Sequence, residues 1–115
     1  APHAIREKLT LANEAAVLVA ELEGSVIGFA FLEFEAIDYA MLLENAAWLH
    51  DLYIDEAARG TGAGMLLVEA AAEAARELGA GKLVLTVAAK NEFAHEFFRH
   101  SGFRETMIEM TRNLA

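Results

Sequence analysis

The sequence predicts a single α/β (α+β) domain over residues 1–115, with a mixed sheet flanked by helices. Short apolar runs rich in β-branched and aromatic residues are followed by two segments with helical spacing, and glycines mark the joints between them. A composition of 56% hydrophobic and 23% charged residues is typical of a globular protein. The chain is long enough for one hydrophobic core and no more.

The first half of the chain favours strands. We expect a short helix at residues 4–12, although the helical period of this segment is poor. Residues 16–22 and 26–35 form apolar runs on either side of Glu23-Gly24, which predicts a β-hairpin. The pattern at residues 36–45 is irregular and indicates a loop or a helical turn.

The middle of the chain predicts a strand, a long helix and a second strand. Residues 47–54 are the first strand, and residues 83–88 form a nearly continuous apolar run that is typical of a strand covered on both faces. Between them, residues 63–78 have helical spacing, with glycines beyond the end that terminate the helix. Its polar face consists of Glu69, Glu73, Arg76 and Glu77.

The end of the chain predicts a helix and a last strand. Asn91 is a suitable N-cap for a helix that ends near Ser101, and Gly102 suits its C-terminal cap. Residues 103–111 alternate in polarity, which favours a closing strand.

Charge and cysteine content exclude several classes of function. The formal charge of −9, from 18 acidic and 9 basic residues, is unfavourable for binding nucleic acid. It would attract a cationic acceptor such as an amine, or it simply keeps the protein in solution. Without cysteine there are no disulfides or thiolate metal sites, and we expect no metal.

Neither a membrane span nor a signal peptide is indicated. No apolar run approaches the roughly 18–20 residues that a membrane span requires, and the first residues lack an apolar segment. We therefore expect no membrane partner and a cytoplasmic location. The chain begins without methionine, which we interpret as a processed or truncated chain, or as a domain that lacks its usual opening elements.

The run from Arg59 to Gly64, between a strand and a long helix, predicts a phosphate-binding loop. Glycines allow successive backbone N–H groups to converge on an anion, and the helix adds its positive end. A Walker A loop is excluded because Gly64 is followed by Met65 and Leu66, and a dinucleotide loop because its third glycine would fall on Met65. The alternative is a tight strand-to-helix turn with no ligand.

The same run, with its surroundings, resembles the GNAT superfamily of N-acetyltransferases. RGTGAG matches that family's R/Q-x-x-G-x-G/A signature, and LHDLYIDEAARGTGAG is similar to its motif strand and loop. VAELEGSVIGFA looks like the preceding hairpin, and NEFAHEFFRHSGF looks like the later helix. These segments follow one another in the family's order from Val19 to Phe103.

The resemblance implies a mostly antiparallel sheet that splays at an acetyl-CoA site. Acetyl-CoA would be a co-substrate, with its pantetheine arm bound to the backbone of Leu52, Tyr53 and Ile54. The pyrophosphate would be held by backbone N–H groups of Arg59, Gly60, Thr61, Gly62, Ala63, Gly64 and Met65. Asn91, Ala94 and Phe98 would line the pantetheine channel, although Ala94 and Phe98 are also explained by core packing.

The reaction that the resemblance implies is direct attack of an amine on the thioester. His50 occupies a position where relatives often place the base, and the alternative is an exposed histidine with no catalytic role. Trp48 replaces a glutamate that some relatives have. Asp51 is expected on the other face of the sheet unless a bulge intervenes. Glu33, Glu35 and Glu44 are candidates for contacting a cationic acceptor, or they are surface carboxylates.

The chain departs from the family in ways that leave its activity open. The tyrosine that protonates the thiolate is Phe98 here, so water or His100 substitutes, or the thiolate leaves unassisted. The alternatives are a non-catalytic acetyl-CoA-binding or regulatory module, and a purely structural domain with an empty loop. The family's first strand and helices are missing or reduced to residues 4–12, and a long loop before the last strand is absent. We therefore expect a homodimer, in which the C-terminal strand pairs with another subunit or a second chain completes the pocket. We expect it to act on a small-molecule or protein amine that the sequence does not identify.

Overall fold

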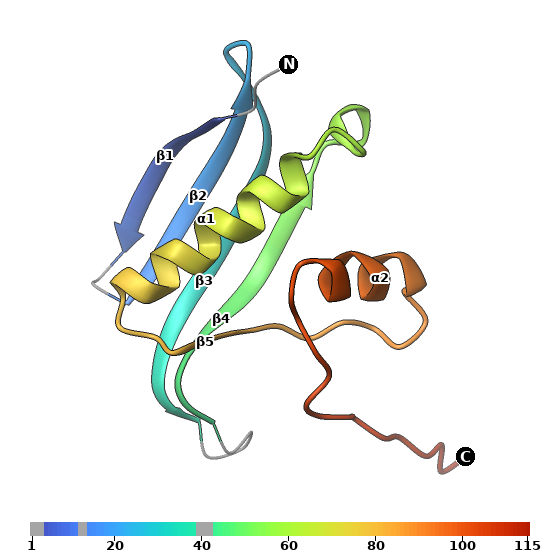
Figure 1. The fold of residues 1–115 in the computed structure, drawn as a ribbon. Helices are drawn as coiled ribbons and strands as arrows, with labels where there is room; N and C mark the ends of the chain where they lie inside the picture. The colour runs from blue at the N-terminus through green and yellow to red at the C-terminus, as the bar shows by residue number, and fades with distance from the viewer. Residues whose placement is uncertain (1–3, 12–13, 39–42) are drawn as a thin grey trace.

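The computed structural model describes residues 4–11, 14–38 and 43–115. In this part of the chain a five-stranded sheet has the order β1-β2-β3-β4-β5. One helix, α1, lies across a face of the sheet, and the second, α2, lies beside β4 (Figure 1). Neighbouring strands are antiparallel except for β4 and β5, which are parallel. The predicted mixed, mostly antiparallel sheet flanked by helices is confirmed.

The strands and helices follow one another with short connections. None of the helices in the described ranges is long and apolar enough to cross a membrane. The bounds are β1 Ala4–Leu11, β2 Ala15–Leu22, β3 Ser25–Asp38, β4 Leu43–Ile54, the 3-10 helix η1 Glu56–Ala58, α1 Ala63–Glu77, β5 Lys82–Val84 and α2 Glu92–His100.

Residues 4–11 are a strand, so the helix expected over residues 4–12 is wrong for the residues that the structure describes. β1 is antiparallel to β2, from Ala4 opposite Glu21 to Leu11 opposite Ala15, with an irregularity between Ile5 and Glu7. A sheet edge gives every second backbone group a hydrogen-bond partner, and this pairing overrides a weak local preference for helix.

The β2–β3 hairpin has the predicted turn. Both turn residues have positive φ, 51° at Glu23 and 83° at Gly24, as a tight hairpin connection requires. β3 continues to Asp38 and β4 begins at Leu43, so the loop predicted over residues 36–45 is wrong at both ends. Residues 39–42 lie outside the described ranges.

The core lies between α1 and the sheet. Leu18 of β2, Leu32 of β3 and Leu67 of α1 are its largest fully buried side chains. Each contributes about 1.5–3 kcal/mol through burial. Alanines from β2, β3 and α1 surround them and let the helix approach the strands closely: Ala16, Ala20, Ala30, Ala71 and Ala74 are all at most 1% exposed.

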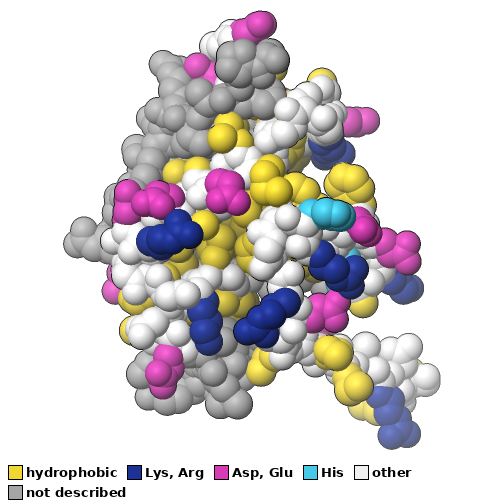
Figure 2. All heavy atoms as spheres, in the orientation of Figure 1, with side chains coloured by type: hydrophobic (Ala, Val, Ile, Leu, Met, Phe, Trp, Pro, Cys, Tyr) yellow, Lys and Arg dark blue, Asp and Glu magenta, His cyan; other side chains and the backbone are white. Residues whose placement is uncertain are grey.

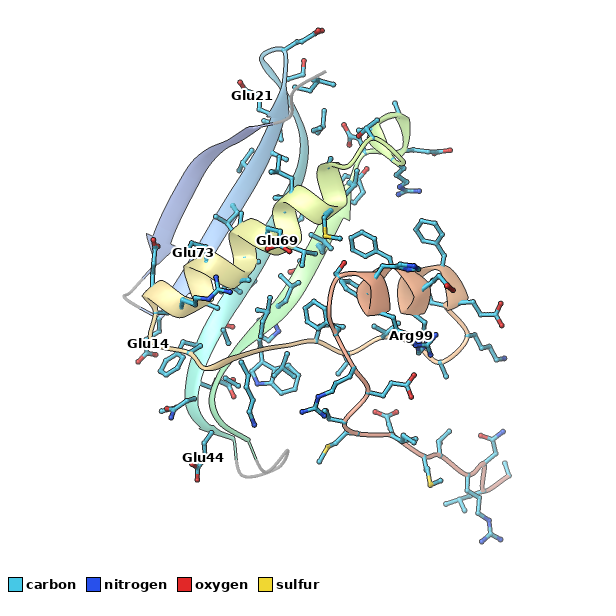
Figure 3. All side chains as sticks on the ribbon, in the orientation of Figure 1. Glu14, Glu21, Glu44, Glu69, Glu73 and Arg99 are labelled. Carbon is cyan, nitrogen blue, oxygen red and sulfur yellow. The ribbon has the colours of Figure 1, made fainter. Side chains whose placement is uncertain are left out.

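The outer face of α1 is polar, as predicted. Figure 3 labels Glu69 and Glu73, which both point away from the sheet. Arg76 donates from Nη1 to Glu73 Oε2 at 2.9 Å on the same exposed face. The predicted helix therefore has the predicted orientation, and it ends where Gly79 adopts a φ of 97°.

β5 is shorter than the strand predicted over residues 83–88. It consists of Lys82–Val84, which pair with residues 46–48 of β4. Residues 85–88 then diverge from β4 toward α2 and have no strand structure. The apolar run in this segment is explained by a cavity that it lines, described below.

The C-terminal segment, residues 103–115, is neither helix nor strand, so the predicted closing strand is wrong. Arg99 of α2 donates from Nη2 to Glu105 Oε1 at 2.8 Å. This hydrogen bond and the guanidinium charge lower the pKa of the Glu105 carboxyl. Beyond this contact the chain runs away from the sheet and exposes hydrophobic side chains (Figure 2). Alternating polarity alone does not make a strand, because the segment must also pair with a neighbouring strand.

Candidate functional site

The loop between β4 and α1 is shaped to receive an anion. Gly60 and Gly62 have φ of 80° and 95°, a conformation that L side chains rarely adopt. A Cβ on either glycine would meet nothing within 4 Å, so the space above the loop is open. Gly62 is the N-cap of α1 and caps it with no side chain. The first N–H groups of the helix, from Ala63 to Met65, thus have no intrahelical acceptor and are available to a ligand.

Hydrogen bonds inside the loop fix its shape. The N–H of Arg59 donates to the carbonyl of Glu56 at 3.3 Å. The Nε of Arg59 donates to the carbonyl of Ile54 at 3.1 Å, and the Thr61 hydroxyl donates to the carbonyl of Ala58. Two of the predicted contacts, the Arg59 N–H and the Ile54 carbonyl, are therefore engaged within the protein.

The sheet splays next to this loop. β4 and β5 pair only from Ala46 opposite Lys82 to Trp48 opposite Val84. β4 continues to Ile54, and no described strand pairs with this outer half on the β5 side. Leu52, Tyr53 and Ile54 lie in it, where an extended ligand can add to the strand through backbone hydrogen bonds. The predicted splay of the sheet is confirmed.

A cavity of about 250 Å³ occupies the region where β4 and the β5 segment separate. It unites five of the predicted site residues, His50 and Leu52 from β4 with Asn91, Ala94 and Phe98 from the α2 region. The rest of its lining is Leu49, Leu85, Thr86, Val87 and Ala88. Sequence reasoning missed these five, because it assigned residues 85–88 and Leu49 only to strands. The lining, mostly apolar with a few polar groups, resembles that of a small-molecule site, and the volume lies a little below the roughly 300–1,000 Å³ of typical ligand pockets.

His50 lies at a β-bulge in β4. Phe31 of β3 is opposite Asp51 and Leu32 is opposite Leu49, so His50 is the extra residue. Leu49 on one side of the bulge belongs to the core and Leu52 on the other side packs against it, whereas His50 and Asp51 are both exposed. The bulge therefore places Asp51 on the same face as His50, contrary to the expectation from regular alternation. In the sequence, this bulge is indicated by two successive polar residues, His50 and Asp51, between Leu49 and Leu52.

The His50 ring has two neighbours on β3. Its Nε2 lies 3.2 Å from Glu33 Oε1. Its plane stacks on Phe31, with ring centroids 5.7 Å apart and an interplanar angle of 30°. Because Phe31 and Glu33 are two apart on one strand, they share a face of the sheet. Their pairing with His50 depends on the register between strands, which the sequence did not define.

Asn91 and Phe98 combine structural roles with their place at the cavity. The Asn91 side chain accepts a hydrogen bond from the Ala94 N–H at 3.1 Å, which confirms it as the N-cap of α2. Phe98 packs edge-on against Phe97 and Phe103, with centroids 5.1 Å and 5.5 Å away. Phe97 also approaches the glycine loop, since a Cβ on Gly64 would lie 3.1 Å from its ring. α2 therefore connects the cavity to the loop.

The remaining ionisable candidates do not reach the cavity. His100 places Nδ1 3.0 Å from the Glu96 carbonyl and lies outside the cavity lining. His95 places Nε2 3.1 Å from the Ala88 carbonyl. Glu35 and Glu44 are exposed. Within the described ranges no group of three or more His, Asp or Glu side chains could hold a metal ion.

Comparison with known proteins gives consistent results. Residues 1–103 match the Acetyltransferase (GNAT) family. An uncharacterized N-acetyltransferase of Methanocaldococcus jannaschii is 31% identical over 96 residues, which are 84% of this chain and 42% of that protein. A solved putative acetyl transferase from Pyrococcus furiosus superposes with a TM-score of 0.76 at 27% identity, covering 88% of this chain and 66% of that one.

A third relative was solved with a ligand. AAC(6')-Iy, in complex with the bisubstrate analogue CoA-S-monomethyl-acetylneamine, has a TM-score of 0.79 at 20% identity, over 90% of this chain and 71% of that one. At this identity the likeness concerns the fold. The chain spans less than half of the Methanocaldococcus protein and about two thirds of the solved chain from Pyrococcus. Since the family match extends over residues 1–103, this chain belongs to the GNAT acetyltransferase family.

Proposed function

We propose that this chain binds acetyl-CoA and transfers the acetyl group to an amine by direct attack. The observation that supports this most strongly is the cavity at the splay, which joins His50 to the half of β4 that pairs with β3 alone among the described strands, and to α2. A cytosolic location and a small-molecule or protein amine as acceptor stay predictions. The net charge of −9 favours an acceptor that is cationic before it reacts.

The loop and the strand would divide the cofactor between them. N–H groups at the start of α1 would bind the pyrophosphate, and the open φ > 0 glycines leave room for it. The backbone of Leu52 and Tyr53 would bind the pantetheine amides. Ala94 and Phe98 would cover the arm from α2, where both are partly buried at the cavity.

Bound acetyl-CoA supplies a thioester carbonyl carbon, to which the amine nitrogen forms its bond as the C–S bond breaks. His50 would take the proton that the amine loses, directly or through a water. A backbone N–H of β4 would stabilise the oxyanion. Phe98 has no proton to donate, so the thiolate would be protonated by water.

Replacing His50 by alanine tests the base. We expect kcat to fall by about 100-fold, because positioned bases contribute roughly 10²–10⁴, while the dissociation constant for acetyl-CoA stays within about twofold. His100→Ala is the matched control, since His100 lies outside the cavity. Steady-state kinetics with an amine panel and calorimetric titration with acetyl-CoA measure the two quantities. An unchanged kcat in His50→Ala would remove His50 from the chemistry.

A non-catalytic acetyl-CoA-binding module is the second candidate, and Phe98 is the observation that favours it. A phenylalanine at the cavity cannot protonate the leaving thiolate. Micromolar binding of acetyl-CoA, with no amine acetylated by the unmodified chain or by His50→Ala, would support the module. Restored turnover in Phe98→Tyr would show that only the acid is missing.

We also propose that the chain forms a homodimer through its C-terminal segment. This segment exposes Met107, Ile108, Met110 and Leu114, which are 51%, 77%, 88% and 92% exposed. β5, at the edge of the sheet, has a free side that a strand from a second copy could occupy. Light scattering at micromolar concentration should give twice the chain mass of 12.5 kDa, and a chain that ends at Phe103 should be monomeric. A monomeric mass for the full chain would contradict this proposal.

A further inference from the structure

We infer that Glu33 is the positioning residue for His50: its carboxylate fixes which ring nitrogen is protonated and leaves the other free to accept a proton. The inference rests on the proposed function for its catalytic meaning. The contact itself is a property of the fold, between β3 and the bulge in β4. The two claims can therefore be tested separately.

The ring of His50 is held at its edge and at its face. Glu33 Oε1 lies 3.2 Å from Nε2 at the edge, and Phe31 stacks on the face at a centroid distance of 5.7 Å. Because His50 is the extra residue of the bulge, no residue of β3 lies directly opposite it. These two side chains of β3 thus restrict the rotation of the ring. The bulge alone would not restrict it.

The chemistry of the contact sets the tautomer. An ionised carboxylate only accepts hydrogen bonds, so the neutral imidazole must place its hydrogen on Nε2 to interact with Glu33. Nδ1 then keeps its lone pair and becomes the basic atom. A proton taken by His50 would therefore bind at Nδ1, the ring nitrogen that does not face Glu33.

The contact contributes little to the stability of the fold. The His50 and Glu33 side chains are 39% and 49% exposed, and exposed pairs are worth little in double-mutant cycles. Removal of the Glu33 carboxylate is therefore expected to change the tautomer of His50 without unfolding the protein. Glu35 provides the matched control, since it lies two residues further along the same strand, is exposed, and is not in contact with His50.

The test is nitrogen NMR of the histidine rings in the whole chain at pH 8.5, with the His50 signals assigned from their absence in His50→Gln. In the unmodified chain we expect shifts of a nearly pure Nε2–H tautomer. In Glu33→Ala the two nitrogen shifts should move toward each other as tautomers mix. Glu33→Gln keeps an acceptor oxygen and should retain most of the unmodified pattern. Glu35→Ala should leave it unchanged.

Turnover is measured on the same proteins. We expect kcat to fall by about tenfold in Glu33→Ala, within the range by which a misplaced base loses rate, with an unchanged KM for acetyl-CoA. Unmoved nitrogen shifts in Glu33→Ala, or an Nδ1–H tautomer in the unmodified chain, would overturn the inference. Nitrogen shifts that move as expected in a chain without turnover would support the positioning role and would count against the proposed function alone.

Discussion

Replacement of Gly62 by valine is expected to weaken acetyl-CoA binding by about 10–100-fold. Gly62 has a φ of 95° at the start of α1, and a β-branched residue is a strong outlier in that region. The loop must change shape to accept valine, so the N–H groups that follow would no longer point at the pyrophosphate. Hydrogen bonds to a charged group are worth about 1.5–3 kcal/mol, and about 1.4 kcal/mol corresponds to tenfold in affinity.

Gly79→Val is the matched control for this variant. Gly79 has nearly the same φ, 97°, and a Cβ there likewise meets nothing within 4 Å. It lies beyond the C-terminal end of α1, opposite the loop end of the helix. Both variants should lose about 1–3 kcal/mol of stability from the strained backbone, and only Gly62→Val should lose affinity in calorimetric titration. Equal affinity losses in the two would trace the effect to the fold rather than to the loop.

Gly28→Ala is expected to destabilise the protein by about 1–3 kcal/mol, the usual cost of an added methyl group in a packed region. The new Cβ would lie 2.5 Å from the Tyr53 carbonyl oxygen and 2.8 Å from Ile54 Cδ1. The carbonyl belongs to the backbone, so only a separation of β3 from β4 relieves the clash. That separation would displace the outer half of β4, and acetyl-CoA affinity should fall as well.

Urea unfolding followed by circular dichroism measures the loss of stability. Gly81→Ala is the control, because a Cβ on Gly81 meets nothing within 4 Å and its φ is not positive. Its free energy of unfolding should stay within about 0.5 kcal/mol. A Gly28→Ala protein as stable as Gly81→Ala would mean that the two strands separate at no cost.

The parts of the fold that the sequence predicted correctly are those with strong local signals. α1 has a polar face at helical spacing and glycines at both ends, and the β2–β3 turn has Gly24 where a positive φ is needed. α2 has Asn91 as its N-cap. In each case neighbours in the sequence decide the conformation, so a short window contains the information.

The errors occur where distant partners decide. Residues 4–11 became a strand because β2 offers an edge, whereas residues 103–111 pair with none of the described strands. The apolar run at residues 85–88 predicted a strand, whereas in the structure these residues line the cavity. Whether a run pairs, and for how long, depends on the path of another segment, which periodicity does not record.

The candidate site also has one part that local motifs predicted and another that depends on distant partners. The glycine loop and the α2 residues could be named from motifs, since each role there depends on a residue type at a fixed spacing. The contact between Glu33 and His50 needed the register of β3 against β4, and the bulge shifts that register by one residue. The sequence hint was the pair His50-Asp51 between two leucines, which breaks the alternation of the strand.

The bulge also determines which changes of length β4 can accept. Deleting one residue at position 50 would restore regular pairing with β3 and would leave the core leucines, Leu49 and Leu52, in place. The sheet would remain intact while the imidazole disappeared from the site. Adding a second residue there would place Leu52 four positions after Leu49, so regular alternation would again keep both on one face, but the pairing of the outer half with β3 would shift by two residues. At this position the loss of a residue would therefore keep the pairing of the outer half, whereas an added residue would change its register.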